Sequence, residues 1–595
     1  MARDRSSEIR WEEWSSEAFD RARREGKPVL LTIGAPWCHW CHVLDRTSYS
    51  DPDVIALIND RFVPVRVHAD RRPDLQDRYL MGGWPTTAVL TPDARILTGS
   101  TYMPPEQMLR VLRQADQVYR EDRETVTMRV ARMTEEAEVE RRRLEHPGET
   151  LDARALDALD AVLRREFDWA NGGFGTEPKF PFPDAVRLAF LLYRRSGDEH
   201  MLEIARTTLD GMAGLMDPVW GGMYRYSVDP HWRHPHYEKM LYTQAGALEN
   251  YVEAYQVTGE EKYLEIALGI RRYVERFLSD RERGGFYGSQ DADAGSHEPE
   301  ADLVTGEEYF AKGEDERLAI GVPYVDRAVY AGWNSMMCSA YFRLCGAADD
   351  ADAGGFAAET VERLLRENLR DGLVYHYNDG EPRLPGLLAN QAHFARALID
   401  GFQTTGRREY LEHAVRIARV MLEEMQDRER GGFYYQHPGS AETLGGYRPH
   451  KPFEENACSA RMLIELSYLA GDASYREAAG RALEAVSYPR MVESIIGAGY
   501  GLALDLYLAA PMQIVVVGRR GDTETGRMLR AGLRAYEPKK IIRILDPDED
   551  PLRIGEAEYP SRAEPVAYVS QPGAPTRPVA GSEELAAALK DLPPV

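Results

Sequence analysis

Residues 28–42 run PVLLTIGAPWCHWCH, and this stretch decides the fold of the first part of the chain. It opens with an apolar run at 28–34, which predicts a buried strand, and Ala35-Pro36-Trp37 ends that run. Cys38 and Cys41 follow with the spacing Cys-x-x-Cys, where a helix is expected to begin. The stretch therefore predicts a strand that leads into a dithiol at a helix N-terminus.

Two later segments fit the same domain. Residues 62–67, FVPVRV, predict a second buried strand, and residues 88–99, with a turn at 92–94, predict a hairpin. Strand, dithiol at a helix start, strand and hairpin follow one another in the order of a thioredoxin-like domain. In such folds a cis-proline before the hairpin faces the dithiol, and Pro85 in GGWPTT at 82–87 fits that place.

The position of the dithiol predicts its chemistry. The free amides and the macrodipole of a helix N-terminus stabilise a thiolate, so we expect the pKa of Cys38 to lie below the ordinary thiol value of about 8.5. Cys38 is then the nucleophile, and Cys41, one turn later, resolves the mixed disulfide. His39 favours the thiolate when protonated, and we place His39 and Trp84 among the substrate-binding residues, beside a catalytic Pro85.

Two other interpretations of the cysteine motif compete with this one. Cys-x-x-Cys-His is also the attachment sequence of c-type haem, with His42 as the iron ligand, but haem is normally attached outside the cytoplasm. Zinc bound with the help of His39 or His42 is the second, although no further Cys-x-x-Cys stands nearby. Haem explains neither the preceding strand nor the later Trp84-Pro85, and with zinc also disfavoured the sequence predicts a redox dithiol with no metal and no cofactor.

The composition is that of an ordinary globular protein, with 43% hydrophobic and 29% charged residues among 595, a length that predicts several domains. The formal net charge of -24 argues against nucleic acid as a partner, because a phosphate backbone requires a cationic surface. No run approaches the ~20 apolar residues that span a bilayer. The first residues, MARDRSSEIRWEEW, contain no apolar segment typical of a secretory signal. We therefore expect a cytoplasmic protein without a membrane partner.

From about 150 to 510 the sequence is almost entirely helical in pattern, with amphipathic segments separated by short polar turns. A glycine-led motif recurs between helix pairs, and six such motifs indicate six repeated units. Six helical hairpins that close into a ring predict an (α/α)6 barrel, and an open solenoid is the alternative. The motifs are GGFG at 172, GGMY at 221, GGFY at 284, DGLVYH at 371, GGFY at 431 and GYGLAL at 499.

The loops at one mouth of such a barrel carry its chemistry, and residues 225–239, RYSVDPHWRHPHYEK, are the richest of them. Aromatic rings, histidines and carboxylates in a concave mouth are the groups that a sugar site uses. We take His236 and Glu238 as candidate catalytic residues, with His393 as the partner of His236 in an epimerisation. The competing interpretation is that such groups cap helices and order loops. The candidate substrate-binding residues of the barrel are Lys179, Arg225, Tyr226, His234, Lys239, Asp291, Asp293, Trp333 and Asn334.

The last segment predicts a small α/β unit, with strands at MQIVVVG, KKIIRIL and VAYVSQ and helices at ETGRMLRAGLRAY and SEELAAALK. Its Gly518-Arg-Arg-Gly521 is too short for a nucleotide-binding loop. The expected organisation is a thioredoxin-like domain at 1–125, a linker helix at 126–150, the barrel at 151–510 and the α/β subdomain at 511–595.

Together these motifs resemble the family of spermatogenesis-associated protein 20 over nearly the whole chain. The resemblance rests on CHWCHVL at 38, RRPD at 71, GGWPTT at 82, GGFGTEPKFPFP at 172, RYSVDPHW at 225, PHYEKMLY at 235, GGFYGSQDAD at 284 and WN at 333. It implies a thioredoxin-like domain joined to a barrel similar to N-acylglucosamine 2-epimerase and six-hairpin glycosidases, without a settled reaction. The chain departs from the family at Thr86, at Asn390-Gln-Ala and near Ser570, where a family segment carries two cysteines.

Three functional hypotheses follow. The first is a thiol–disulfide redox protein whose barrel binds a carbohydrate-like small molecule or a protein thiol client. The second is a sugar-active enzyme, an epimerase or a glycosidase, with a regulatory dithiol, and the third is a binding protein without activity. Whether the dithiol reduces, oxidises or isomerises depends on local electrostatics, and the sequence leaves the oligomeric state open.

Overall fold

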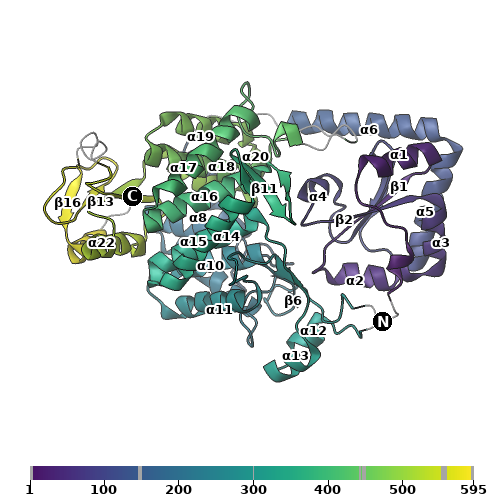
Figure 1. The fold of residues 1–595 in the computed structure, drawn as a ribbon, viewed down its shortest axis with the longest axis horizontal. Helices are drawn as coiled ribbons and strands as arrows, with labels where there is room; N and C mark the ends of the chain where they lie inside the picture. Colours follow the sequence, from purple (N-terminus) through teal and green to yellow (C-terminus); the bar gives the residue numbers. More distant parts are fainter. Residues whose placement is uncertain are drawn as a thin grey trace.

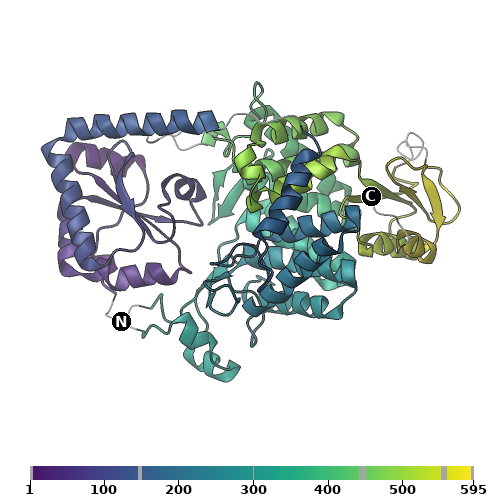
Figure 2. The same ribbon diagram turned by 180° about the vertical axis from the view of Figure 1, so that it is seen from behind.

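The computed structural model describes residues 4–144, 151–298, 301–440, 444, 450–550 and 559–590. The chain forms a helical barrel with an α/β unit at each end (Figures 1 and 2). The N-terminal unit has the thioredoxin-like order of elements, and the C-terminal unit lies at the opposite end of the barrel. The multidomain fold class predicted from the sequence is confirmed.

The N-terminal domain is built on a four-stranded sheet in the order β2-β1-β3-β4. β1 pairs with β2 in parallel and with β3 antiparallel, and β4 completes the hairpin. β1 is central and nearly all buried, which its apolar sequence VLLTIG allows. The strands are β1 (Val29–Gly34), β2 (Val63–His68), β3 (Thr86–Leu90) and β4 (Ile96–Ser100), and the α-helices are α1 (Ser16–Glu25), α2 (His39–Arg46), α3 (Pro52–Arg61), α4 (Pro73–Tyr79) and α5 (Pro105–Glu121).

A long helix, α6 (Arg123–Leu144), runs from this domain toward the barrel (Figure 1). Most of its side chains up to residue 139 are exposed, which is typical of a polar spacer rather than of a core helix. The linker helix was expected at 126–150, and residues 145–150 of that range lie outside the described part of the chain.

Six inner helices form a closed ring in the order α8-α10-α14-α16-α18-α21, and α21 packs back against α8. Each inner helix carries one outer helix: α9 packs on α8, α11 on α10, α15 on α14, α17 on α16 and α19 on α18. The sixth pair joins α7 to α21, the first and the last long helices of the ring. The inner helices are α8 (Pro183–Ser196), α10 (Leu241–Thr258), α14 (Ala331–Ala348), α16 (Leu388–Thr405), α18 (Phe453–Ala470) and α21 (Ala498–Leu508), and the outer helices are α7 (Arg154–Glu166), α9 (Glu199–Met212), α11 (Glu261–Phe277), α15 (Ala351–Glu367), α17 (Arg408–Val420) and α19 (Ala473–Val486).

The two layers differ in sequence because they differ in surroundings. Inner helices such as α10 and α14 have neighbours on several sides and bury residues around most of their circumference. Outer helices such as α11 and α17 are amphipathic, with one apolar face against the ring and a charged face toward water. Across the described ranges, none of the helices has both the length and the apolar character that crossing a membrane requires.

Five of the six glycine motifs form loops that lead from an outer helix to the next inner helix. The first glycine of the loop has a positive φ, for example 74° at Gly172 and 73° at Gly221. A Cβ on Gly221 would lie 2.5 Å from the backbone oxygen of Gly269 in α11, so both the conformation and the close approach require glycine. The prediction was wrong for GYGLAL at 499, which lies inside α21, where Gly501 lets Leu159 of α7 approach closely.

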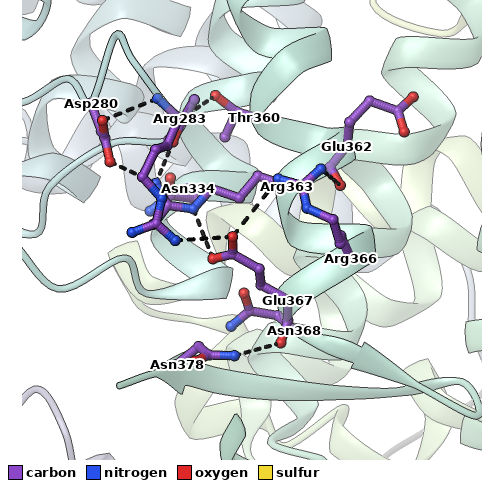
Figure 3. Close-up of polar contacts among 12 residues, drawn as sticks. Asp280, Arg283, Asn334, Thr360, Glu362, Arg363, Arg366, Glu367, Asn368 and Asn378 are labelled. Atoms are coloured by element: carbon purple, nitrogen blue, oxygen red, sulfur yellow. Dashed lines mark hydrogen bonds and ion pairs between the residues drawn. The ribbon is translucent and has the colours of Figure 1, made fainter. Parts of the chain in front are cut away.

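An amide and a cation hold these loops in place, as the loop at 284 illustrates (Figure 3). The side chain of Asn334 accepts the backbone N–H of Phe286 at 2.7 Å and donates to its carbonyl at 2.9 Å. Arg363 of α15 pairs with Asp280 at 3.0 Å and also donates to the carbonyl of Gly284. In the other loops the equivalent amides are Gln244, Gln391 and Asn456, and the equivalent cations are Lys179, Lys239 and Lys451.

Short strands and two helices extend the inner-helix loops at the mouth, and Figure 1 shows β6 and β11 on the side of the N-terminal domain. β5 pairs with β6, β7 to β9 form one small sheet, and β10 to β12 form another. These elements are β5 (Tyr226–Ser227), β6 (Pro235–His236), β7 (Lys239–Met240), β8 (Ser289–Gln290), α12 (Gly306–Phe310), α13 (Glu314–Ile320), β9 (Val325–Asp326), β10 (Leu369–Arg370), β11 (Leu373–Asn378) and β12 (Pro382–Pro385).

The C-terminal unit repeats the topology of the first domain. Its sheet has the order β14-β13-β15-β16, in which β13 pairs with β14 in parallel and with β15 antiparallel, and β15 and β16 form a hairpin. The helix α22 connects the two parallel strands, as α2 and α3 do in the first domain. The elements are β13 (Met512–Val517), α22 (Thr523–Arg534), β14 (Lys540–Leu545), β15 (Val566–Ser570), β16 (Arg577–Ala580) and α24 (Ser582–Lys590).

Candidate functional site

The dithiol lies at the N-terminus of α2. Cys38 is the N-cap residue, and its Sγ accepts the backbone N–H of Cys41 at 3.2 Å. Both cysteines are free thiols, and their exposed fractions are 4% and 8%. The Trp84–Pro85 peptide before β3 is cis, as the sequence predicted. The thioredoxin-like arrangement of dithiol and proline is therefore present, but the thiols are covered by protein.

The mouth of the barrel supplies part of that cover. The guanidinium of Arg225 lies 4.7 Å from the ring centre of Trp37 and 5.0 Å from that of Trp84. Arg225 also lies 3.9 Å from Glu238, whose side chain is buried and whose Oε2 has no hydrogen-bond partner among the described residues. Both barrel residues are close enough to Cys38 to interact with it electrostatically. The domain and the barrel thus share one site.

This cover changes the acidity of Cys38. Burial raises the pKa of Cys38 well above its ordinary value, and Cys41 and Glu238 raise it further. The backbone N–H of Cys41 opposes this effect without outweighing it. The expectation of a lowered pKa was wrong, because the helix N-terminus that should stabilise the thiolate is not open to water and faces a carboxylate of the barrel.

Two histidines of the segment at 38–42 bind the barrel. His39 Nδ1 lies 2.7 Å from Asp293, and this hydrogen bond raises the pKa of His39. His42 Nε2 lies 2.9 Å from Asp291. Burial lowers the pKa of His42, but the carboxylate raises it more, to about 9. Burial likewise raises the pKa of Asp291, but the imidazolium lowers it more, to about 2, so the two form a charged pair at neutral pH.

A cavity of about 340 Å³ lies beside Cys41. Cys41 and Pro85 line it, together with His42, His68 and His297. His297 comes from the barrel, and its Nε2 lies 2.7 Å from the backbone oxygen of Pro36. Cys41 therefore adjoins a space large enough for water molecules, whereas Cys38 faces the barrel.

Three aromatic rings stack at the edge of the site. The ring of Tyr226 lies between those of Phe180 and His236, with 4.5 Å between ring centres on each side. Phe180 is 38% exposed, so one end of the stack reaches water. His236 Nδ1 lies 3.4 Å from Glu238 Oε1. The structure thus brings four predicted residues, His236, Glu238, Arg225 and Tyr226, together next to the dithiol.

Several predicted site residues lie elsewhere. Lys179 and Lys239 are fully buried inside glycine loops, where each pairs with an aspartate at 2.8 Å. Asn334, also fully buried, holds another glycine loop. His234 lies on an exposed turn beside Asp229. The expectation of substrate contact is corrected for the first three, because their polar atoms are already used by the loops that they hold.

Two further predicted residues, Trp333 and His393, lie in different parts of the molecule. Trp333 packs on Tyr242 with 5.1 Å between ring centres, and both rings border the core of the N-terminal domain. His393 lies on α16, where its Nδ1 is 3.9 Å from the sulfur of Cys458. The pairing of His393 with His236 in an epimerisation stays a prediction, because a base and an acid on opposite faces of a sugar need not contact each other.

Polar residues that the sequence did not indicate also lie between the two domains. Trp37 Nε1 donates to Asp70 Oδ2 at 2.7 Å, and the backbone oxygen of Asp70 lies 2.7 Å from His376 Nε2. Burial raises the pKa of Asp70 to about 7. His376 is the last residue of DGLVYH, which served only as a repeat marker, and nothing in the local sequence shows that it reaches the other domain.

Comparison with protein families agrees with this architecture. Residues 1–138 match a family model named Thioredox_DsbH, described as a protein of unknown function (DUF255), and residues 174–310 match the model of N-acylglucosamine 2-epimerase. The chain is 27% identical to spermatogenesis-associated protein 20 of Homo sapiens, over 91% of this chain and 84% of that protein. The rat protein of the same name is 26% identical, over 91% and 83%. The resemblance inferred from the motifs is confirmed.

Shorter or more distant likenesses were also found. A stretch of 80 residues is 35% identical to the thiol:disulfide interchange protein DsbD of Pseudomonas fluorescens, covering 13% of this chain and 14% of that protein. Among solved structures, cellobiose 2-epimerase of Bacillus thermoamylovorans is similar with a TM-score of 0.44 and 15% identity, over 55% of this chain and 85% of that one. A D-mannose isomerase has a TM-score of 0.44 and 12% identity, over 56% and 84%.

Proposed function

We propose that the chain is a thiol–disulfide oxidoreductase whose dithiol, Cys38 and Cys41, works against the mouth of its own barrel. The observation that carries this proposal is the position of Glu238 and Arg225, two barrel residues, beside a buried Cys38. The thioredoxin-like sheet and the local similarity to DsbD support redox chemistry. A cytoplasmic location is part of the proposal, and five free cysteines agree with a reducing compartment.

The proposed reaction converts a disulfide R–S–S–R′ into two thiols. Cys38 transfers its proton to Glu238, and the thiolate attacks one sulfur, so that Cys38–S–S–R forms and R′–S⁻ leaves. R′–S⁻ takes the proton from Glu238. Cys41 then attacks the sulfur of Cys38, the Cys38–Cys41 disulfide forms, and R–S⁻ leaves with the proton of Cys41. Two electrons and two protons pass from the dithiol to the substrate, and the reverse sequence oxidises a client dithiol.

The barrel supplies the base in this scheme. A thiol whose pKa lies well above its ordinary value keeps its proton at neutral pH, so the nucleophile needs a proton acceptor. Glu238 is suited to this role because it is buried next to Cys38 with Oε2 unpartnered among the described residues. Arg225, held by Trp37 and Trp84, provides the positive charge that faces both the carboxylate and the thiolate.

The variant Glu238→Gln separates proton transfer from simple repulsion. If the carboxylate only repels the thiolate, its removal lowers the pKa of Cys38 and speeds the reaction at neutral pH. If it accepts the proton, the variant is slower, by about 100-fold, which is the result we expect. The measurement is stopped-flow reduction of a small aromatic disulfide by the reduced chain across neutral and alkaline pH.

Two further variants complete this experiment. Cys38→Ser is the blank, and Glu307→Gln, which removes an exposed carboxylate of α12, is the matched control. A faster Glu238→Gln chain would contradict the role of Glu238 as base. A wild-type rate equal to that of Cys38→Ser would contradict the oxidoreductase proposal as a whole.

A sugar-active enzyme is the second candidate, favoured by the aromatic stack of Phe180, Tyr226 and His236 beside Glu238. A ring face at the edge of a polar site is suited to the apolar face of a sugar. This candidate expects His236→Ala to abolish turnover of a monosaccharide or disaccharide, followed by NMR, while Cys38→Ser leaves the turnover intact. Turnover that survives in His236→Ala, or a wild-type chain that turns over no sugar, would contradict this candidate.

A further inference from the structure

A second polar cluster at the boundary of the two domains takes no part in the proposed thiol chemistry. His68 is the last residue of β2, Asp70 lies two residues later, and Asp326 belongs to β9 of the barrel. One ligand atom from each of the three lies within 4.8 Å of the others. Asp70 and Asp326 are 7% and 4% exposed. A half-buried imidazole and two buried carboxylates, drawn from both domains, thus lie around one point.

The three side chains face one another without bonding. Among the described residues no hydrogen bond or ion pair joins any two of them, and His68 Nδ1 is buried without a hydrogen-bond partner. Their remaining bonds point to other neighbours: Asp70 Oδ2 accepts the indole N–H of Trp37 at 2.7 Å, and Asp326 Oδ2 accepts the hydroxyl of Tyr330 at 2.8 Å. Such outer bonds orient the carboxylates as second-sphere partners orient metal ligands.

The neighbouring cluster of His42, Asp291 and His297 is made of the same residue types, but there the histidines pair directly with the aspartate. Both imidazoles approach one oxygen of Asp291, at 2.9 Å from His42 Nε2 and 3.4 Å from His297 Nε2. The charged His42 balances that carboxylate. In the other cluster no hydrogen bond or ion pair joins His68 to Asp70 or Asp326 among the described residues, so no proton links the histidine to either carboxylate there.

Arginines balance the two carboxylates only at a distance. Arg71 acts on Asp326 and Arg225 acts on Asp70, but within the described part of the chain neither forms an ion pair with that carboxylate. Arg71 is exposed and lies over the ring of Tyr377, 5.6 Å from its centre. Two buried carboxylates and an imidazole therefore lie together without a cation of the chain in direct contact, an arrangement that a bound metal ion would complete.

We propose that His68, Asp70 and Asp326 bind a divalent first-row cation such as Zn²⁺. One imidazole and two carboxylates are a ligand set that Zn²⁺ accepts, whereas Ca²⁺ and Mg²⁺ prefer oxygen alone. Bonds of about 2.0–2.2 Å place ligand atoms roughly 3–4 Å apart, so a small inward movement of the side chains completes the site. Because the ligands come from both domains, the ion clamps the N-terminal domain on the barrel. The inference does not rest on the redox proposal.

The test begins with the metal alone. The full chain is purified without a metal-binding tag and freed of metal, and Zn²⁺ and Co²⁺ are then titrated into it. We expect about one equivalent of metal per chain, visible Co²⁺ absorption that Zn²⁺ abolishes, and a higher melting temperature in the presence of Zn²⁺. Absence of stoichiometric binding of both metals would overturn the proposal.

Variants then assign the ligands. Asp326→Asn and His68→Gln should each weaken metal binding at least about tenfold, while Glu307→Gln, which removes an exposed carboxylate of α12, leaves binding unchanged. Using two ligand variants, each checked by circular dichroism, guards against loss of fold in one of them. Metal lost in Asp291→Asn, which alters the neighbouring cluster, and retained in Asp326→Asn, or a thiolate-to-cobalt charge-transfer band that disappears in Cys41→Ser, would also overturn the assignment. Cys38→Ser, which removes the proposed nucleophile, should bind the metal as tightly as the wild-type chain, so a failure of the redox proposal would not affect the metal site.

Discussion

The two α/β units at the ends of the molecule share one topology and differ in chemistry. Their sheets have the orders β2-β1-β3-β4 and β14-β13-β15-β16, with the same parallel and antiparallel pairings. Cys38 is the N-cap of α2, and Asp522 is the N-cap of α22. Three residues later stand Cys41 in the first unit and Thr525 in the second. Both units therefore have residues at the two positions of a dithiol, but only the first unit has cysteines there.

The surroundings of these positions also correspond. Pro85 precedes β3, and Pro565 precedes β15. Four residues before each N-cap stands a glycine whose absent side chain would meet the residue at the second dithiol position: Gly34 faces the sulfur of Cys41, and Gly518 faces the hydroxyl oxygen of Thr525. The correspondence thus extends from strand order to individual side-chain sites.

The comparison shows that a helix N-terminus in this fold does not by itself make a site reactive. Both caps accept backbone N–H groups, Cys38 from Cys41 at 3.2 Å and Asp522 from Thr525 at 3.0 Å. Asp522 is exposed, whereas Cys38 is buried under the barrel mouth. The reactivity that we propose therefore depends on the two sulfurs and on the residues that cover them.

The largest expected effect comes from moving the dithiol from one unit to the other. A Cys38→Ser/Cys41→Ser chain should reduce disulfides no faster than the blank. Adding Asp522→Cys and Thr525→Cys should restore a two-electron couple, because the cap geometry is already present, and exposure should bring the pKa of the first thiol below about 8.5. Mass spectrometry after oxidation and alkylation rates against pH measure both. If the transplanted pair formed no disulfide, positions 522 and 525 would not have the side-chain geometry of positions 38 and 41.

The next effect concerns how each unit is held on the barrel. The pKa of His42 is about 9 when folded, above its ordinary 6.5, so its stabilising contribution is complete below pH 6.5 and is lost as the pH rises through 9. The difference corresponds to at most about 3 kcal/mol. Asp291, with a pKa of about 2, loses its contribution only as the pH falls from about 4 through 2. We expect limited proteolysis to release the N-terminal domain first as the pH rises from 6 to 10.

The C-terminal unit serves as the internal control in that experiment. It is held by pairs such as Arg194–Glu537 at 3.3 Å, and a guanidinium does not deprotonate in this range. His42→Asn should remove most of the pH dependence, and His231→Asn, at an exposed histidine, should leave it in place. Equal release of both units at high pH would show that the histidine pairs do not set the docking.

A smaller effect distinguishes the two glycines. A Cβ on Gly518 would collide with Thr525 and lie 3.1 Å from Pro565, so Gly518→Ala should lower the free energy of unfolding by about 1–3 kcal/mol. A Cβ on Gly34 would lie 3.5 Å from the sulfur of Cys41, an ordinary contact, and Gly34→Ala should cost less than about 1 kcal/mol. Urea unfolding of both variants decides the matter, and the reverse ranking would contradict the packing described.

The smallest effect is that of the cap itself. Asp522 accepts the N–H groups of Glu524 and Thr525 at 2.9 and 3.0 Å, so Asp522→Ala should lower the free energy of unfolding by about 1 kcal/mol. Asp522→Asn keeps an acceptor and should cost a few tenths as much. Chemical unfolding followed by circular dichroism provides both values, and equal losses in the two variants would show that charge rather than hydrogen bonding matters.

Much of the fold was predictable because its signals are local. The apolar run before Cys38, the dithiol spacing and the proline before the hairpin identify a thioredoxin-like domain within a short stretch. Alternating buried and amphipathic helices predict a ring of hairpins, although GYGLAL at 499 misled as a loop because its glycines serve helix packing. The topology of the C-terminal unit was not recognised, since none of the dithiol sequence remains there.

The site was less predictable because its contacts are long-range. His42 pairs with Asp291 and His376 with the backbone of Asp70, contacts that exist only after the domain docks on the barrel. The same docking reverses the expected shift of the Cys38 pKa. Lys239 was misplaced for the opposite reason: it stands in a segment rich in site residues, but its side chain turns back to pair with Asp217.

The pairing of α7 with α21 sets a condition on biosynthesis. α7 ends at Glu166 and α21 begins at Ala498, so the first helix of the ring waits for its partner while most of the barrel is translated. At about 5–20 residues per second this wait lasts roughly 15–60 s. During it the apolar face that carries Leu156, Leu159 and Leu163 has no α21 to cover it. Nascent chains of this protein are therefore expected to be chaperone clients until the ribosome has passed the last hairpin.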